Sequence, residues 1–187
     1  MEGPGRILLH TCCGPCAVHP HRALVGEGFT VTAFFYNPNI QPSREHRRRL
    51  DALRDFAGRV GLEVVTGGDY HPEEHLRATL DIRGDRARRC RACYDLRLGA
   101  AAEEASRRGF PAFTTTLLVS PYQLHDEVRR AGEAAAARTD GRVAFLYRDF
   151  RPGWKEGVAA SREMGLYRQA YCGCLWSEVE RYERPRS

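Results

Sequence analysis

The segment Ile7–Cys16, ILLHTCCGPC, places three cysteines directly after a short apolar run. The apolar run predicts a buried strand, and Gly14-Pro15 predicts the turn that leads out of it. In open α/β sheets, ligands bind beyond the carboxyl ends of the strands. We therefore expect the thiols of Cys12, Cys13 and Cys16 to lie at that edge of a sheet, and the chain to be organised around thiol chemistry.

Short apolar segments alternate with segments of helical period along the whole chain. The expected strands are Ile7–His10, Thr30–Tyr36, Leu62–Val65, Ala112–Val119 and Val143–Tyr147. The first expected helix begins within Cys12–Cys16 and ends near Glu27, and the others cover Ser43–Val60, Pro72–Leu80, Cys90–Arg107, Gln123–Arg138, Lys155–Met164 and Tyr171–Tyr182. Strands separated by helices predict a doubly wound parallel α/β sheet of about five strands. At 187 residues, without an internal repeat, we expect one domain over residues 1–187.

The composition indicates a cytoplasmic protein with reactive thiols. No apolar run approaches the roughly 20 residues that span a bilayer, and the N-terminus lacks the cleavage site of a signal peptide. In the cytoplasm, seven cysteines at close spacings indicate metal binding or redox catalysis more than structural disulfides. Lys155 is the only lysine, so nearly all positive charge is arginine. Nucleotide bias in the genome would explain this choice, and so would bidentate contacts to phosphate.

Cys90-x-x-Cys93 places two thiols on one face of a helix. This spacing alone suits zinc, an iron–sulfur cluster or a dithiol couple. Adjacent cysteines such as Cys12 and Cys13 are uncommon in zinc sites, and four thiolates from these two segments match the Cys₄ ligation of a [4Fe–4S] cluster. The arginines that flank Cys90 are expected to favour its thiolate form.

The remaining cysteines have other expected roles. One glycine separates Cys172 from Cys174, a spacing that strains a disulfide but permits it, and strained disulfides are the redox-active ones. We expect an electron-transferring dithiol at Cys172 and Cys174, with additional cluster ligands as the alternative. Cys16 is a candidate ligand for a further metal. Buried structural cysteines and a structural zinc site are the simpler explanations of the whole set.

Five blocks of sequence, in the same order along the chain, closely resemble the QueH-type epoxyqueuosine reductases, the cobalamin-independent enzymes of queuosine biosynthesis. The blocks are Leu8–Cys16, Tyr36–Ile40, Cys90–Leu98, Ser120–Gln123 and Tyr167–Cys174. The resemblance extends from about residue 6 to residue 177. It implies a fold related to the PP-loop (HUP) nucleotide hydrolase-like sheets, in agreement with the order of strands and helices above.

The resemblance also implies an activity, the reduction of epoxyqueuosine to queuosine at the wobble base of tRNA, as the last step of queuosine biosynthesis. It implies a [4Fe–4S] cluster on four cysteines and a redox-active pair on two others. The implied cluster ligands are Cys12, Cys13, Cys90 and Cys93, and the implied redox pair is Cys172 and Cys174. An additional mononuclear iron beside the cluster is linked to the region of Cys16, where some members carry aspartate. An external electron donor is expected.

The resemblance places the phosphate loop of related ATPases after the first strand, where this chain has Thr11–Cys16 in place of a Ser-Gly-Gly-x-Asp-Ser-like sequence. ATP is therefore not expected as a partner, nor is a membrane. Two arginine runs, one at Arg44 and Arg47–Arg49 and one between residues 83 and 97, are candidates for phosphate contacts. Tyr36, Asn37 and Asn39 are expected to line the pocket for the modified base.

The proton donor for the leaving oxygen has four candidates, and a structural role is the simpler explanation of each. They are His10, Tyr94, Asp95 and Tyr122. Two other functions remain open: a zinc-stapled tRNA-binding module without catalysis, and a thiol–disulfide oxidoreductase that acts on proteins.

Overall fold

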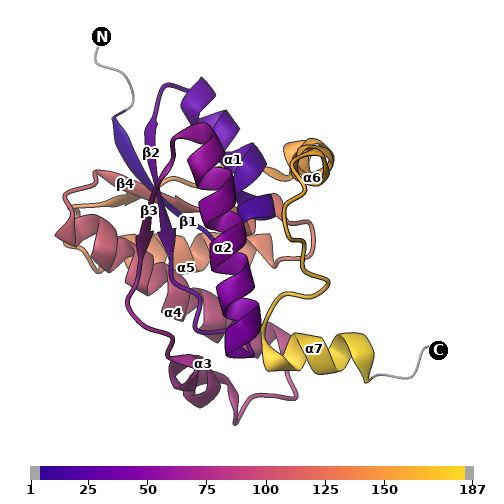
Figure 1. The fold of residues 1–187 in the computed structure, drawn as a ribbon. Helices are drawn as coiled ribbons and strands as arrows, with labels where there is room; N and C mark the ends of the chain where they lie inside the picture. Colours follow the sequence, from indigo (N-terminus) through magenta and orange to yellow (C-terminus); the bar gives the residue numbers. More distant parts are fainter. Residues whose placement is uncertain (1–4, 184–187) are drawn as a thin grey trace.

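Five strands form one parallel sheet in the computed structural model of the chain, which describes residues 5–183 (Figure 1). The strands are β1 (Arg6–His10), β2 (Thr30–Phe35), β3 (Glu63–Thr66), β4 (Ala112–Thr115) and β5 (Ala144–Phe145). Their order is β3-β2-β1-β4-β5, and all neighbours are parallel. In the central strand, Leu9 lies opposite Ala33 of β2 and Thr114 of β4. The predicted doubly wound parallel sheet is confirmed.

Helices cover both faces of this sheet. They are α1 (Gly14–Gly26), α2 (Ser43–Val60), α3 (Pro72–Thr79), α4 (Arg86–Arg107), α5 (His125–Ala137), α6 (Trp154–Glu163) and α7 (Leu175–Tyr182), with short 3₁₀ helices η1 (Thr116–Val119) and η2 (Arg151–Gly153). Helices α1, α2 and α6 pack together on one face, and α4 and α5 pack on the other (Figure 1). The chain reverses its direction of winding between β1 and β4. The segments that follow these two strands therefore meet at the switch point, where such sheets bind ligands.

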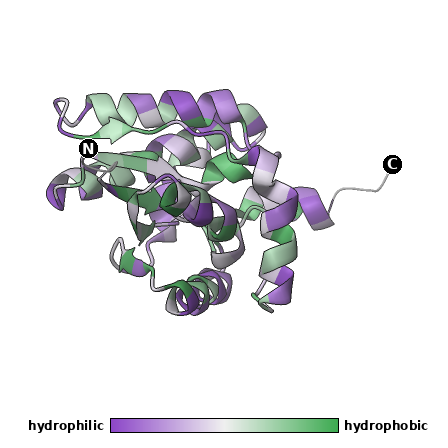
Figure 2. Cartoon of the chain, turned by 90° about the horizontal axis from the view of Figure 1, so that it is seen from above, coloured by the Kyte–Doolittle hydropathy of each residue, from purple (hydrophilic) through white to green (hydrophobic). Residues whose placement is uncertain are grey.

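The core explains why the first strand is a continuous apolar run. Ile7, Leu8 and Leu9 are all 0% exposed because helices cover both faces of β1. The central strands consist mainly of hydrophobic residues, whereas hydrophilic residues are concentrated on the outer helices (Figure 2). Among the described residues, no helix has the combined length and apolar character that crossing a membrane requires.

Several boundaries differ from the expected ones, β5 for example being limited to Ala144–Phe145, and two of the differences arise because a side chain bonds to the backbone. α4 begins at Arg86, one turn before Cys90, since the Asp85 carboxylate accepts a hydrogen bond from the backbone N–H of Arg88 at 3.1 Å. β4 ends at Thr115 instead of Val119. The Thr115 hydroxyl accepts from the backbone N–H of Leu117 at 3.1 Å and starts η1.

The predicted last helix is wrong in its first turn, so the two C-terminal cysteines lie outside it. α7 begins at Leu175, and Cys174 is its N-cap residue, with a sulfur that accepts from the Ser177 N–H at 3.3 Å. Gly173 has φ of +118°, which a helix cannot contain. Cys172 and Cys174 are therefore carried by a turn.

Gly14, the first residue of α1, allows that helix to touch α2. A Cβ atom at this position would lie 2.3 Å from the carbonyl oxygen of Ala52. Gly14→Ala should lower the free energy of unfolding by about 1–3 kcal/mol, the usual cost of overpacking. Gly26→Ala, at the other end of α1, meets nothing within 4 Å. It should change stability by less than about 1 kcal/mol. Urea denaturation measures both, and equal effects would contradict the close α1–α2 contact.

Candidate metal centre

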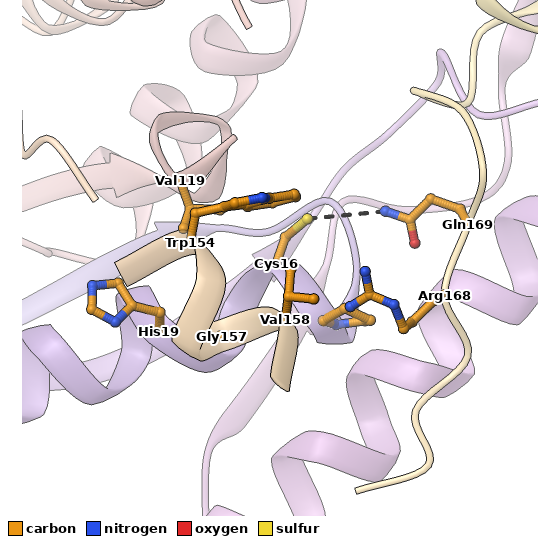
Figure 3. A pocket seen from close by; sticks show the side chains of 9 residues that line it. Cys16, His19, Val119, Trp154, Gly157, Val158, Arg168 and Gln169 are labelled. Carbon is orange, nitrogen blue, oxygen red and sulfur yellow. Dashed lines mark hydrogen bonds between the residues drawn. The ribbon is translucent and has the colours of Figure 1, made fainter. Parts of the chain in front are cut away.

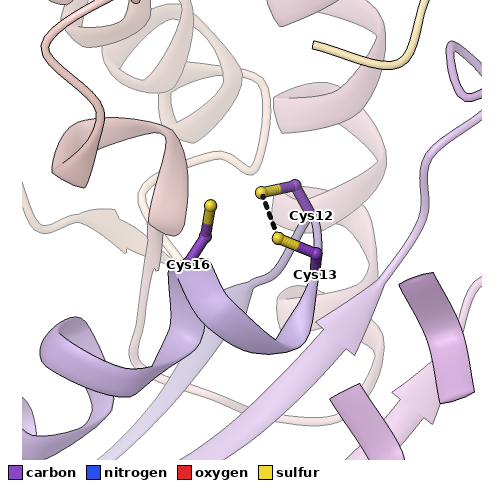
Figure 4. A group of neighbouring side chains, drawn as sticks. All are labelled: Cys12, Cys13 and Cys16. Carbon is purple, nitrogen blue, oxygen red and sulfur yellow. Dashed lines mark hydrogen bonds between the residues drawn. The ribbon is translucent and has the colours of Figure 1, made fainter. Parts of the chain in front are cut away.

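Three thiols gather where β1 ends and α1 begins. The sulfur atoms of Cys12, Cys13 and Cys16 all lie within 4.8 Å of one another (Figure 4), and those of Cys12 and Cys13 are 3.8 Å apart. Cys13 caps α1 and Cys16 lies in its first turn, so the helix brings the third sulfur back over the first two. The three thiols could hold a metal ion.

Groups from both sides of the switch point contact these sulfurs. The Thr116 hydroxyl, just after β4, donates to the sulfur of Cys12 at 3.5 Å and accepts from the Cys12 backbone N–H at 3.2 Å. The Gln169 amide, from the loop after α6, donates to the sulfur of Cys13 at 3.0 Å. The predicted place of the thiols, at the carboxyl edge of the sheet, is confirmed by these contacts.

Hydrogen bonds within the group decide which sulfur carries the charge. The thiols of Cys13 and Cys16 both interact with Cys12, and these bonds lower the pKa of Cys12 well below its usual value. The same bond to Cys12 raises the pKa of Cys13 to about 12. Bonds to Cys12 and Cys13, together with burial, raise the pKa of Cys16. Of these three thiols, Cys12 is therefore the most readily deprotonated.

Arg97 of α4 links the first cysteines to the second pair. Its side chain is 1% exposed. One guanidinium nitrogen donates to the sulfur of Cys93 at 3.8 Å, and another donates to the Asn37 amide oxygen at 2.7 Å. The Asn37 amide nitrogen donates to the carbonyl of Thr11 at 3.0 Å. Arg97 also interacts electrostatically with Cys12.

The thiols of Cys90 and Cys93 are held in their protonated form in the metal-free protein. Burial raises the pKa of Cys93 to about 12, and burial likewise raises the pKa of Cys90 in spite of Arg86 and Arg89. Arg86 and Arg89 do favour the Cys90 thiolate, as expected, but the effect of burial on the pKa is larger. Among the described residues, neither sulfur belongs to the 4.8 Å group of three.

A second buried arginine fixes the turn that carries the dithiol. Arg49 of α2 is 1% exposed and pairs with Glu45 at 2.7 Å. Its other guanidinium nitrogens donate to the carbonyls of Cys172 at 2.7 Å and Tyr171 at 3.1 Å. A Cβ atom at Gly173 would lie 2.8 Å from this guanidinium, so glycine is required there. In the sequence, Arg49 could be recognised only as a member of a basic run.

All seven cysteines are free thiols in this structure. The Cys174 thiol forms a hydrogen bond with the sulfur of Cys172. This hydrogen bond is the main cause that lowers the pKa of Cys172 to about 6. The same contact, together with burial, raises the pKa of Cys174. Cys172 is exposed, and it interacts electrostatically with Cys12 and Cys93. An accessible thiolate therefore lies beside the buried thiols.

A small cavity adjoins Cys16 (Figure 3). Its volume is about 50 Å³, room for one or two water molecules. Trp154 and Val119 line one side, and Gln169 points its amide nitrogen at the Cys16 sulfur from 3.9 Å. The Gln169 amide oxygen is buried without a hydrogen-bond partner among residues 5–183. A polar group of a ligand could bond to it.

Several predicted residues have other roles. Burial lowers the pKa of His10 to about 3, so its imidazole is neutral and bonds to Thr115 at 2.8 Å. Tyr94 donates to Gln123 at 2.7 Å, and burial raises its pKa. Asp95 pairs with Arg130, and Tyr122 is 73% exposed. These contacts give His10, Tyr94 and Asp95 structural roles, and a proton donor among the four stays a prediction.

The arginine runs divide between the interior and the surface. Arg49, Arg89 and Arg97 are buried, so these three cannot contact the phosphates of an RNA stem. Arg44, Arg47 and Arg48 remain exposed on α2. Of the residues expected to line a base pocket, Tyr36 and Asn37 line a cavity of about 340 Å³ beside α2. Asn39 is buried outside its lining.

Comparisons with known proteins agree on one family. The family model described as "Epoxyqueuosine reductase QueH" matches residues 7–180. A protein of that description from Dehalococcoides mccartyi is 37% identical over 97% of this chain and 97% of its own length. The corresponding protein of Thermotoga maritima is 36% identical over 96% of this chain and 94% of its own length. That of Haemophilus influenzae is 32% identical over 94% of this chain and 73% of its own length.

Replacing Arg49 tests how firmly the dithiol turn is held. Arg49→Met leaves the buried Glu45 without its ion-pair partner and frees two carbonyls, so stability should fall by about 3–5 kcal/mol. Arg48→Met is the matched control, because Arg48 is exposed on the same helix and its guanidinium lies over the Tyr167 ring, 5.6 Å from the ring centroid. This change should cost less than about 1 kcal/mol. Denaturant unfolding under identical conditions compares them, and equal losses would contradict the role of Arg49.

The dithiol contact predicts how alkylation depends on pH. Because the pKa of Cys172 is lowered to about 6, its thiolate is present above that pH and is lost as the pH falls through it. In the reduced, metal-free protein, the rate of Cys172 alkylation by iodoacetamide should have its midpoint near that value. Cys174→Ala removes the bond and should move the midpoint toward about 8.5, the value of a free cysteine. Peptide mass spectrometry assigns the rates, and identical midpoints would contradict the contact.

Proposed function

The chain belongs to the epoxyqueuosine reductase QueH family, and from this membership we propose that it reduces epoxyqueuosine in tRNA to queuosine, the last step of queuosine biosynthesis. The observation that carries the proposal is the group of three thiols at the end of β1, with an accessible dithiol turn beside it. We propose that one domain, residues 1–187, performs the reaction in the cytoplasm.

The reaction needs electrons that ordinary side chains do not supply. Converting an epoxide to an alkene breaks two C–O bonds, consumes two electrons and two protons, and releases water. Oxidation of Cys172 and Cys174 to a disulfide releases two electrons and two protons, so one dithiol balances one turnover. An external electron donor must then reduce the disulfide. The hydrogen bond between the thiols of Cys172 and Cys174, together with the exposure of Cys172, supports this role.

We propose a [4Fe–4S] cluster on Cys12, Cys13, Cys90 and Cys93, and Cys16 as a ligand of an additional iron. The fit rests on the donor set, since thiolates suit such clusters, and on Cys16, whose sulfur lies within 4.8 Å of the first two. When bound, these groups supply one-electron transfer and a Lewis acid.

The chain itself supplies charge and hydrogen bonds to such a centre. Arg49 and Arg97, both buried, offset the negative charge of thiolates without competing for metal. The donors on Thr116, Gln169 and Arg97 already point at cysteine sulfurs. Donors to sulfur stabilise the more negative, reduced form of a cluster and so set its potential.

We propose that the reaction proceeds without ATP. A phosphate loop needs free backbone N–H groups after the first strand. In this chain the Cys12 N–H is bonded to Thr116 at 3.2 Å, and three thiols occupy the space above.

Anaerobic reconstitution with iron and sulfide, followed by an assay on tRNA that contains epoxyqueuosine, tests the proposal. The protein should turn brown and form queuosine-containing tRNA. Cys90→Ala should reduce turnover to background and lower the iron content. Glu103→Ala, an exposed change on the same helix, should leave both unchanged. Full activity of Cys90→Ala would exclude Cys90 as a required cluster ligand.

The reconstituted and metal-free proteins also distinguish the proposed reductase from the two alternative functions. A zinc-stapled RNA-binding module would remain colourless and bind tRNA without reducing it. A thiol–disulfide oxidoreductase would keep its dithiol activity after all metal is removed, whereas the proposed reductase should form no queuosine in that state.

A further inference from the structure

A cavity of about 340 Å³ lies between α2 and the loop that joins β3 to α3. Its size falls within the roughly 300–1,000 Å³ of small-molecule sites. It lies at the carboxyl ends of β2 and β3, the edge of the sheet that also carries the thiols. None of the cysteines lines it.

One wall of the cavity carries two arginines, and Asp69 is the acidic residue among the others that line it. Arg47, Leu50 and Arg54 follow one face of α2 at helical spacing, and all three line the cavity. Both arginines are exposed. Within residues 5–183, Arg47 has no ion-pair or hydrogen-bond partner, and Arg54 has only Asp51 at 3.8 Å. The arginines lie about 10 Å apart along the helix axis. This wall suits phosphate groups of an extended strand.

The other walls offer aromatic rings held in place. The Tyr70 hydroxyl donates to the Ile40 carbonyl at 2.9 Å, and the Tyr70 and His46 rings lie 4.7 Å apart. The Tyr36 hydroxyl bonds to Glu74. Bases stack on such rings with little dependence on sequence. Arginines beside aromatic rings are the chemistry of a site for single-stranded RNA.

A buried wall separates the cavity from the thiols. Asn37 lines the cavity but is 1% exposed, and its amide is bonded to the Thr11 carbonyl and Arg97 on the thiol side. A base in the cavity therefore cannot reach Cys12. Whatever nucleotide occupies this cavity is a different one from the nucleotide that reacts.

We propose that this cavity binds a second nucleotide of the substrate tRNA, adjacent to the reacting one, with its base stacked against the aromatic rings and its phosphates on Arg47 and Arg54. The inference rests on the proposed function for the identity of the RNA. It explains how a small protein holds a loop in register: one nucleotide is anchored beside α2 while its neighbour is presented to the metal centre.

Charge reversal on the cavity wall tests the phosphate contacts. The reconstituted double variant R47E/R54E is compared with the wild type for binding of an anticodon stem–loop RNA by fluorescence anisotropy, at several salt concentrations. Affinity should fall about tenfold or more. The slope of log affinity against log salt should fall by about 0.7 for each lost contact. R138E reverses an exposed arginine beyond the far end of α5 and should match the wild type.

An abasic nucleotide next to the wobble position tests the base site. It should weaken binding to the wild type and leave binding to R47E/R54E unchanged, because the cavity no longer holds that nucleotide. Equal weakening in both proteins would overturn the inference, as would unchanged affinity of the double variant. Adenosine monophosphate that binds in the cavity without displacing the stem–loop would assign the site to free nucleotides and overturn it too.

The epoxide-reduction assay keeps the two proposals distinguishable. If the wild type reduces its tRNA and the double variant retains the same KM for it, the inference fails and the proposed function stands. If the wild type binds the stem–loop through the cavity but never reduces epoxyqueuosine, the RNA site stands and the reductase assignment fails.

Discussion

Burial of two arginines beside the cysteines is the constraint on which the site depends. Thiolates and metal–sulfur groups are negative, and charge in a dry interior is tolerated only when it is paired. Arg97 reaches the sulfur of Cys93 from α4, and Arg49 reaches the carbonyl of Cys172 from α2. These helices pack on opposite faces of the sheet (Figure 1), so one guanidinium group approaches the cysteines from each face. Neither arginine could be removed without leaving a partner unpaired.

The switch point of the sheet then gives the thiols their place. Because the chain winds away from β1 in one direction and returns on its other side at β4, the ends of these strands have open space above them. Cys12 occupies this space and is bonded to Thr116 from the neighbouring strand. Thiols thus fill the position in which other proteins of such topology bind phosphate.

The order of strands and helices could be predicted from the sequence, because the periodicity of apolar residues and the Gly and Pro residues at the ends of elements are local features. Two of the errors arose where a side chain bonds to nearby backbone, as Asp85 does at the start of α4 and Thr115 does at the end of β4. The gathering of Cys16 with its neighbours could be expected from its spacing. The burial of Arg49 could not, because an arginine run looks the same whether a member faces solvent or pairs inside; only its position four residues after Glu45 was a signal. Gln169 lies in one of the five blocks that resemble the family, but its contact with Cys13, 156 positions away in the sequence, could not be predicted.

Helix α2 contacts the dithiol turn on one side and the cavity on the other. Its buried side holds the backbone of the dithiol turn through Arg49, and its open side offers Arg47 to the cavity, only two residues earlier. A rotation of this helix about its axis would shift Arg47 and Arg49 together. The cavity wall that carries Arg47 and the backbone of Cys172 therefore belong to one unit of the fold, and any displacement of α2 moves both.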